Sequence, residues 1–423
     1  MKGFLRGLLL SVLLGIALTF AGCSGGGGGG DDDINPPDAT APTVVVQPLP
    51  MPGPYAVACT NVAQSFNPEW DEEDVKSYWE GTGHYVTELL TDPDNTLIAR
   101  VTAPLDTELY GSFAGEEVDF VVIACYPTTA DNAYSNYPLP TGDVVPHMQT
   151  GSDPPLFADA SARYPVVAFS HGFGDSPISS SAYFTAMSAF ASNGYVVIAP
   201  FHGDFRFSDL NIDNLGDVIS LVENQEDFTA LQALRPLAVS AALDLVLTHP
   251  QWQGHIDETK IGGFGASMGS ETMLLLAGAG LTTSYFDIGD SWKQVTRDTR
   301  IKAAVGYVPY FGQPILPAFG HDQDGLEGIN MSFLGISGTA DTVAPMSEVE
   351  IGMSRLTGTR ELVALSGVEH GFDLASTNDI FTWALLFLDA ELRGNLATKT
   401  QLSTMGSVAG GGDDSVVIFY NGL

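Results

Sequence analysis

The sequence predicts an α/β domain with a mostly parallel central sheet. From about Tyr55 onward, short runs of β-branched and other apolar residues alternate with longer amphipathic or alanine-rich stretches, as they do in β-α-β units. Several short runs are apolar almost without interruption, which is typical of strands buried on both faces of a sheet. With 423 residues and 44% hydrophobic composition, the chain can bury a large core, and one large domain explains the alternation better than several small ones.

The predicted helices lie between the predicted strands. Residues 181–194 end in a glycine stop, residues 230–250 carry a proline inside one helix or between two, and residues 380–394 close the domain. The predicted strands are residues 118–126, 164–170, 195–201, 260–265, 301–309, 331–338 and 361–367.

The first 22 residues are predicted to be a signal peptide. Lys2 and Arg6 precede an apolar run, residues 8–21, that is too short for a comfortable membrane span. The stretch "LTFAGCSGG" around Cys23 resembles a bacterial lipoprotein signal, although Phe20 stands where that pattern usually has leucine. The resemblance implies that Cys23 is lipidated and becomes the new N-terminus. The alternative is ordinary secretion with a free or clipped cysteine.

Residues 23–54 are predicted to be a flexible tether, because a run of glycines and aspartates is followed by a proline-rich spacer. The α/β domain is then expected over residues 55–423. A lipid on Cys23 would hold this domain at the bacterial cell envelope, on the outer membrane or cell surface; without the lipid it would be secreted.

The charge of the chain excludes two classes of partner. Lys and Arg total 16 against 51 Asp and Glu, which gives a net charge of −35. Such a surface repels nucleic acid phosphates and anionic lipids, so we expect no nucleic-acid partner and no membrane contact beyond the lipid anchor. The acidity itself is typical of a solvated surface that keeps a protein soluble; attraction of cationic substrates is the alternative.

Besides Cys23 the chain contains two cysteines, Cys59 and Cys125, and we expect the chain to leave the cytosol. An oxidising destination favours a disulfide between them, and two buried thiols are the alternative. No histidine or basic cluster accompanies either cysteine, so neither is a candidate nucleophile.

The stretch "GFGASMGSE" contains the candidate nucleophile, Ser267. In a chain with 47 glycines, the spacing of Gly265, Ser267 and Gly269 is weak evidence by itself. However, the serine follows a predicted strand and precedes an apolar helical stretch. On such a turn the hydroxyl projects at the carboxyl edge of the sheet, and the flanking glycines admit the close backbone approach that the turn requires. The alternative is a glycine-rich turn with a buried capping serine.

A serine hydroxyl needs a base that a carboxylate orients. His370 follows the last strong strand and Asp341 follows the strand before it, so both lie where an α/β sheet places its catalytic loops. Either residue alone would indicate an ordinary turn or loop position. Together with Ser267 they predict a catalytic triad.

Backbone amides complete the predicted site. The glycines of "FSHGFGDS" let N–H groups turn toward a bound carbonyl, and the expected oxyanion-hole donors are the amides of Phe173 and Met268. His171 in the same loop is expected to be structural, with direct participation in catalysis as the alternative.

These motifs resemble the α/β-hydrolase superfamily of serine esterases. The stretches "YPVVAFSHGFGDS", "GYVVIAPFHGD", "RPLAVSAALDLV", "KIGGFGASMGS", "GTADTVAP" and "VEHGFD" are similar to dienelactone-hydrolase-like and platelet-activating-factor-acetylhydrolase-like proteins, and in part to cutinase-like polyester hydrolases. The resemblance covers residues 55–393. It implies an α/β-hydrolase fold, a triad in the chain order Ser267, Asp341, His370, and cleavage of carboxylic esters through an acyl-enzyme with no metal or organic cofactor.

The resemblance also implies a pocket residue and shows departures. Tyr310 matches an aromatic residue that lines the acyl pocket of the cutinase-like proteins, and core packing is its alternative. Ala266 and Ser270 differ from that pattern. Residues 281–300 and 312–330 add length that can cover the site as a lid or cap.

The substrate class is left open between soluble esters, lipids and polyesters. A catalytically silent hydrolase-fold binding protein of the cell envelope is the alternative from another class.

His202 and Asp204 either border the site or are structural. The acidic stretch "HDQDGLEG" lacks EF-hand spacing, and since no zinc or phosphate-loop motif is present we expect no metal.

Overall fold

A computed structural model describes residues 42–60, 97–138, 144–149, 153–174, 181–208, 224–285, 291–314 and 316–420. All of these residues belong to one unit, Pro37–Leu423. The predicted signal peptide, Cys23 and the glycine run lie outside the described residues.

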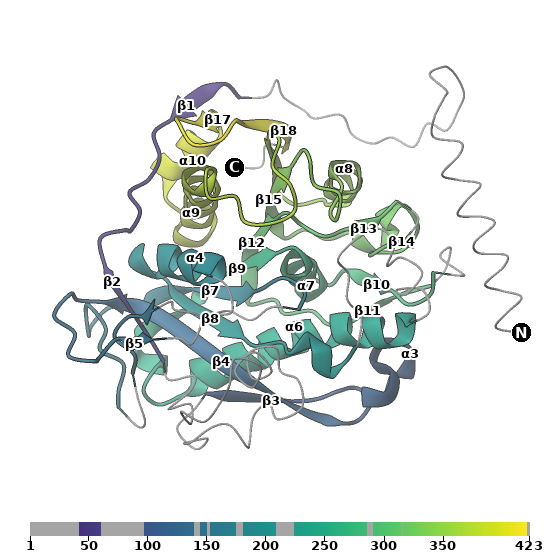
Figure 1. Ribbon diagram of the computed structural model, residues 1–423, viewed down its shortest axis with the longest axis horizontal. Coiled ribbons are helices and arrows are strands. Elements are labelled where there is room, and N and C mark those ends of the chain that lie inside the picture. The colour runs from purple at the N-terminus through teal and green to yellow at the C-terminus, as the bar shows by residue number, and fades with distance from the viewer. Residues whose placement is uncertain are drawn as a thin grey trace, which may run out of the picture. The chain divides into compact units, whose positions relative to one another are not determined.

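A ten-stranded sheet runs through this unit (Figure 1), in the order β18-β16-β15-β12-β9-β7-β8-β4-β2, with β3 paired to β4. The strands from β16 to β8 are all parallel, and the antiparallel strands stand at the two ends of the sheet. This confirms the predicted α/β class and the mostly parallel sheet. The strands are β2 (Ala56–Cys59), β3 (Ile98–Thr102), β4 (Glu117–Thr128), β7 (Tyr164–Ser170), β8 (Val196–Pro200), β9 (Ile256–Ala266), β12 (Ile301–Tyr307), β15 (Ser332–Gly338), β16 (Arg360–Leu365) and β18 (Asp414–Tyr420).

Helices cover both faces of the sheet, which explains why its central strands are apolar at nearly every position. One hydrophobic core lies under α3 (Thr107–Tyr110), α6 (Gln225–Thr248), α7 (Met268–Ala277) and α8 (Met346–Arg355). The other lies under α4 (Ser181–Ser192), α9 (Thr377–Arg393) and the adjoining α10 (Leu396–Leu402). Figure 1 shows α4 and α9 on the opposite side of the central strands from α6 and α7.

Helix α6 is a single helix with Pro236 inside it, which settles the alternative that the sequence left open. By length and composition alone α6 could cross a membrane, but 72% of its most apolar window is buried inside the structure. We therefore assign it to the core of the domain.

The chain joins the domain earlier than predicted. Strand β1 (Val44–Val46) pairs in parallel with β17 (Met405–Val408), the Leu49 N–H donates to Thr382 Oγ1 at 3.0 Å, and the Gly53 N–H donates to Ser192 Oγ at 2.9 Å. The prediction that the flexible tether extends to Pro54 is therefore wrong for residues 42–54. Proline-rich composition excludes regular internal hydrogen bonding, but it does not prevent docking onto a neighbouring surface.

The two segments predicted as a possible lid, residues 281–300 and 312–330, contain short antiparallel strand pairs. Strands β10 (Gly280–Thr282) and β11 (Trp292–Gln294) pair in the first, and β13 (Gly312–Gln313) and β14 (Leu316–Pro317) in the second. A 3₁₀ helix, η7 (His321–Leu326), follows. The Thr282 N–H donates to Ala318 O at 2.9 Å, and Phe319 and Leu326 are fully buried. Part of each segment thus packs in the core, whereas Trp292 and its neighbours are exposed or half-buried. A further short pair is β5 (Tyr137–Pro138) and β6 (Val144–Val145).

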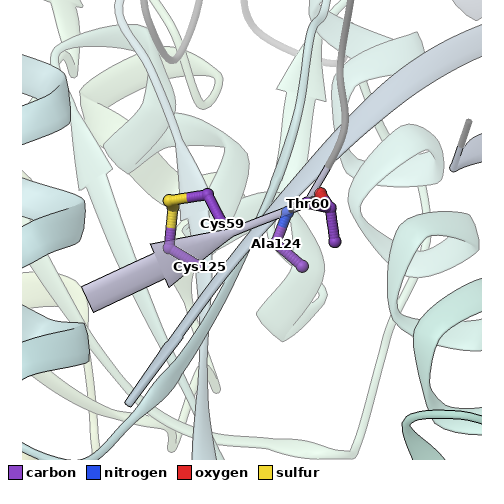
Figure 2. Close-up of a disulfide and its surroundings, with 4 residues drawn as sticks. All are labelled: Cys59, Thr60, Ala124 and Cys125. Atoms are coloured by element: carbon purple, nitrogen blue, oxygen red, sulfur yellow. Dashed lines mark hydrogen bonds between the residues drawn. A yellow bond between two sulfur atoms is a disulfide. The ribbon is translucent and has the colours of Figure 1, made fainter. Parts of the chain in front are cut away.

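Cys59 and Cys125 lie opposite each other on the antiparallel strands β2 and β4 and are joined by a disulfide (Figure 2). The next pair along, Thr60 and Ala124, ties the same strands together: the Thr60 N–H donates to Ala124 O at 2.9 Å, and the Ala124 N–H donates to Thr60 Oγ1 at 3.0 Å. Both cysteines are fully buried.

Candidate active site

Ser267 forms the tight turn between β9 and α7. Its φ of +52° and ψ of −120° lie in a region that non-glycine residues rarely adopt. Its N–H donates to Tyr307 O at the end of the neighbouring strand β12, at 2.9 Å. Strained residues of this kind concentrate at functional sites, and this turn is the strand-to-helix elbow that the sequence predicts around Ser267.

The two flanking glycines are required by close backbone packing. A Cβ on Gly265 would lie 2.2 Å from the backbone of Gly269, and a Cβ on Gly269 would lie 1.9 Å from Ser170 O. Real Cβ atoms do not approach so closely. The spacing of the motif therefore has a direct steric cause, whatever the abundance of glycine in the chain.

The structure brings Ser267, Asp341 and His370 into one hydrogen-bonded chain. His370 Nε2 lies 3.0 Å from Ser267 Oγ, and His370 Nδ1 lies 2.8 Å from Asp341 Oδ2. The other carboxylate oxygen, Oδ1, accepts the N–H groups of Val343 and Ala344 at 2.8 and 2.7 Å. Since the Asp341 side chain is fully buried and accepts on both oxygens, it holds the imidazole with Nδ1 protonated, and Nε2 is free to take a proton from the serine.

Tyr307 holds the loop that carries the histidine. Its hydroxyl donates to Gly371 O at 2.6 Å and accepts the Asp373 N–H at 3.2 Å, while its ring packs on Phe372 at 5.0 Å between centroids. Burial raises the pKa of Tyr307 to about 12, so the hydroxyl keeps its proton at neutral pH. Tyr307 thus connects the two segments: its backbone carbonyl accepts from Ser267, and its side chain holds the loop of His370.

The loop that is predicted to supply an oxyanion-hole amide follows β7 and is described over residues 171–174; it is called the oxyanion loop below. Two of its amides have protein partners. The Gly172 N–H donates to Tyr183 Oη at 3.0 Å, and the Gly174 N–H donates to Asp204 Oδ2 at 2.9 Å. In the described part of the chain, the amide N–H of Phe173 between them has no partner, and neither has that of Met268 at the first position of α7. These two unpaired donors are the ones that the sequence predicts for the oxyanion hole.

A cavity of about 310 Å³ opens over Ser267 and His370. Tyr310 lies in its wall and also packs in the core at 8% exposure; its contact with an acyl group stays a prediction. No described residue from 281–300 or 312–330 lines the cavity, and a lid is not shown. The lining residues are Gly172, Phe173, Ala182, Tyr183, Ala266, Ser267, Met268, Tyr307, Val308, Tyr310, Val343, His370, Gly371 and Phe372.

His171 and His202 lie behind the loop and away from the cavity lining. His171 Nδ1 donates to Gly172 O at 2.8 Å and its Nε2 accepts the His202 N–H at 3.2 Å. His202 Nε2 lies 2.8 Å from Ser170 Oγ. Burial lowers the pKa of His171 to about 3 and that of His202 well below its usual value, so both rings are neutral. Their contacts are with the protein itself, in keeping with structural roles.

Sequence reasoning missed two buried polar side chains near the site, Arg235 and Glu271. Arg235 stands in α6 and pairs with Asp204. Glu271 stands in α7, one turn after Ser267, where its Oε1 accepts from Gln232 at 2.6 Å and burial raises its pKa to about 8. The available signal was a charged residue inside an otherwise apolar helix, because such a residue must find a buried partner or lose its charge.

The acidic stretch of residues 321–328 forms η7 and its flank. Within the residues that the structure describes, no group of three or more His, Cys, Asp and Glu side chains is placed to hold a metal ion.

Comparison with known proteins matches a short segment of the chain. No curated protein matches the chain. Residues 148–208 match the family model of platelet-activating factor acetylhydrolase, isoform II. That segment is about one seventh of the chain; it contains β7, the oxyanion loop, α4, β8 and Asp204, whereas the triad residues lie beyond it. The chain is therefore similar, over this segment, to a hydrolase family of the lipase and esterase type.

Proposed function

We propose that this protein is an α/β-hydrolase that cleaves carboxylic esters, with Ser267 as nucleophile, His370 as general base and Asp341 as the carboxylate that orients the imidazole. The observation that carries the proposal is the hydrogen-bonded chain from Ser267 Oγ through His370 to Asp341, at 3.0 and 2.8 Å. The matched segment supports the reaction class, since its family is named for an acetyl hydrolase.

The reaction proceeds in two halves. His370 Nε2 takes the hydroxyl proton as Ser267 Oγ bonds to the ester carbonyl carbon, and the amides of Phe173 and Met268 donate to the oxyanion. The bond to the leaving alkoxide breaks, and His370 returns the proton to release the alcohol. Water then loses a proton to His370 and attacks the acyl-enzyme. As the second oxyanion collapses, the bond to Ser267 Oγ breaks and His370 returns the proton to that oxygen, which frees the carboxylic acid and restores the serine.

The cavity supports esters with a small acyl group. Its volume is about 310 Å³, and Phe173, Tyr183, Tyr307, Tyr310 and Phe372 are large, rigid parts of its wall. Tyr310 is the proposed contact of the acyl group. We further propose that the protein works outside the cytoplasm, held by a lipid on Cys23 or secreted, on an ester or lipid substrate, with no nucleic-acid partner.

The test is a Ser267→Ala variant assayed with p-nitrophenyl acetate and with a fluorophosphonate probe that labels activated serines. We expect both hydrolysis and labelling to disappear. Ser354→Ala is the matched control, because this half-buried serine of α8 does not line the cavity and, among the described residues, its hydroxyl donates to Ile351 O; its loss should change neither. Hydrolysis or labelling that survives in Ser267→Ala would exclude Ser267 as the nucleophile, and an inactive, unlabelled wild-type protein would favour the silent binding protein instead.

A further inference from the structure

A buried ion pair lies directly behind the oxyanion loop. Arg235 Nε and Nη2 donate to the two carboxylate oxygens of Asp204 at 2.9 and 2.8 Å, with side-chain exposures of 1% and 0%. The pair joins α6 to the turn after β8. Neither residue lines the cavity, so neither can touch the substrate.

Within the described residues, the other hydrogen bonds of the two side chains go to the oxyanion loop. Arg235 Nη1 donates to His171 O at 2.9 Å and Nη2 donates to Gly172 O at 2.8 Å. Asp204 Oδ2 accepts the Gly174 N–H at 2.9 Å. The planar guanidinium therefore holds one carboxylate and two successive carbonyls at once, which is a use that its fixed fork of donors suits and a lysine ammonium does not.

These contacts determine the direction of the Phe173 amide. In a trans peptide the carbonyl and the N–H of one peptide unit point in opposite directions. Gly172 O is held by Arg235 Nη2 and by His171 Nδ1, each at 2.8 Å. The N–H in the same peptide unit is that of Phe173, so it must point away from Arg235, and Phe173 lines the cavity. A flip of this peptide would break both bonds to Gly172 O.

We infer that the Asp204–Arg235 pair is a positioning device for catalysis: it fixes the peptide between Gly172 and Phe173 so that the Phe173 N–H is ready to donate to the oxyanion before substrate arrives. This inference rests on the proposed function. The pair has no net charge, so it acts on the transition state through the geometry of the loop. Its loss should therefore lower kcat much more than it raises KM.

The first variant is Arg235→Lys, which keeps the charge but loses the fork. With p-nitrophenyl acetate we expect kcat to fall about 10- to 100-fold with KM within about threefold of wild type, because a loss of about 1 Å in positioning or of one oxyanion donor has effects of this order. Arg300→Lys is the matched control. Arg300 also contacts α6 and forms an ion pair with the largely buried Asp298, but it belongs to another part of the domain, so it should leave kcat unchanged.

A second measurement separates positioning from stability. The oxyanion hole favours an oxygen anion over the larger, weaker acceptor sulfur, so the ratio of kcat for an ester to kcat for its thionoester measures how well the donors are placed. We expect this ratio to fall about tenfold or more in Arg235→Lys and to stay at the wild-type value in Arg300→Lys. A general loss of folded protein would lower both rates together and leave the ratio unchanged.

The double variant Asp204→Leu with Arg235→Met provides a second test in case Arg235→Lys does not fold. Replacing both members of a buried ion pair by apolar residues is often neutral for stability. It should fold, lose kcat and lose the ester preference. Wild-type kcat and ratio in either folded variant would overturn the inference while leaving the esterase proposal intact. Failure of both variants to fold would assign the pair to stability and would also overturn it. A wild-type protein that does not hydrolyse esters would remove both proposals.

Discussion

A methyl group on Gly269 tests the architecture of the nucleophile turn directly. In Gly269→Ala the new Cβ would lie 1.9 Å from Ser170 O and 2.6 Å from Ser170 C, whereas ordinary contacts begin near 3.4 Å. The two backbones must therefore separate by about 1.5 Å. No flexible side chain can yield in their place, because these two atoms and the next nearest, His171 O at 2.9 Å, all belong to the backbone.

The displacement would act on both halves of the oxyanion hole. Gly269 follows Ser267 by two residues, and Ser170 directly precedes the loop that carries Phe173. A shift of about 1 Å between catalytic groups costs about 100-fold in rate, so we expect kcat for p-nitrophenyl acetate to fall by at least that factor. Overpacking of this kind also costs about 1–3 kcal/mol of stability, so the melting temperature should fall by several degrees.

Gly254→Ala is the control for this prediction, because nothing lies within 4 Å of the Cβ that it would add. Circular dichroism melts and steady-state kinetics on the three proteins are sufficient. If Gly269→Ala retained wild-type kcat and melting temperature, the close contact between α7 and β7 would be wrong, and with it the steric explanation of the glycine spacing.

Three further predictions follow from single contacts. Asp341→Asn should lower kcat for p-nitrophenyl acetate roughly 10³- to 10⁴-fold, since an amide cannot hold the imidazole in the productive tautomer; a loss below tenfold would contradict the role of Asp341. Burial raises the pKa of Glu271 from 4.5, its ordinary value, to about 8. Between these two pH values the folded protein therefore keeps a proton that the unfolded chain releases. The free energy of unfolding falls as the pH rises through this range. The melting temperature of Glu271→Gln should therefore rise relative to that of wild type between pH 5 and pH 8. A difference in melting temperature that does not change with pH would contradict the buried carboxyl. Replacing Cys59 and Cys125 together by alanine should lower the free energy of unfolding by about 2–4 kcal/mol, because the bond closes a loop of 66 residues; equal denaturation midpoints in urea would show that the bridge contributes no stability.

The parallel core and the meeting point of the triad could be predicted from the sequence because one physical rule connects them. Strands buried on both faces are apolar over most of their length, so β7, β8, β12 and β15, the last six residues of β9 and the last four of β16 stand out along the chain. Residues that follow such strands gather at one edge of the sheet, which is why Ser267, Asp341 and His370 could be named together. Their proximity is a property of the structure, and their catalytic roles remain proposals.

Other parts of the fold were not predictable in the same way. The antiparallel strands at the two ends of the sheet depend on pairings over long separations in the chain, as when β18 pairs with β16. Residues 42–54 dock through the three-residue pairing of β1 with β17 and through single hydrogen bonds to α9 and to the end of α4. Contacts this short leave no periodic pattern in the sequence. The contacts of Tyr307 with Gly371 and Asp373 depend on the path of a loop that has no regular structure.

The presence of Arg235 in the core requires an explanation other than stability. The chain has 16 Lys and Arg residues against 51 acidic ones, and a buried arginine gives up its hydration and considerable side-chain entropy. Apolar residues of similar volume in place of a buried ion pair are often neutral for the free energy of folding. They could not bind two consecutive carbonyls and a carboxylate, however, and the loop would then lose the contacts that give its peptides one direction. The pair is best understood as a constraint on the oxyanion loop. That loop and Asp204 lie in the segment whose sequence matches a hydrolase family, and Arg235 reaches them from outside that segment.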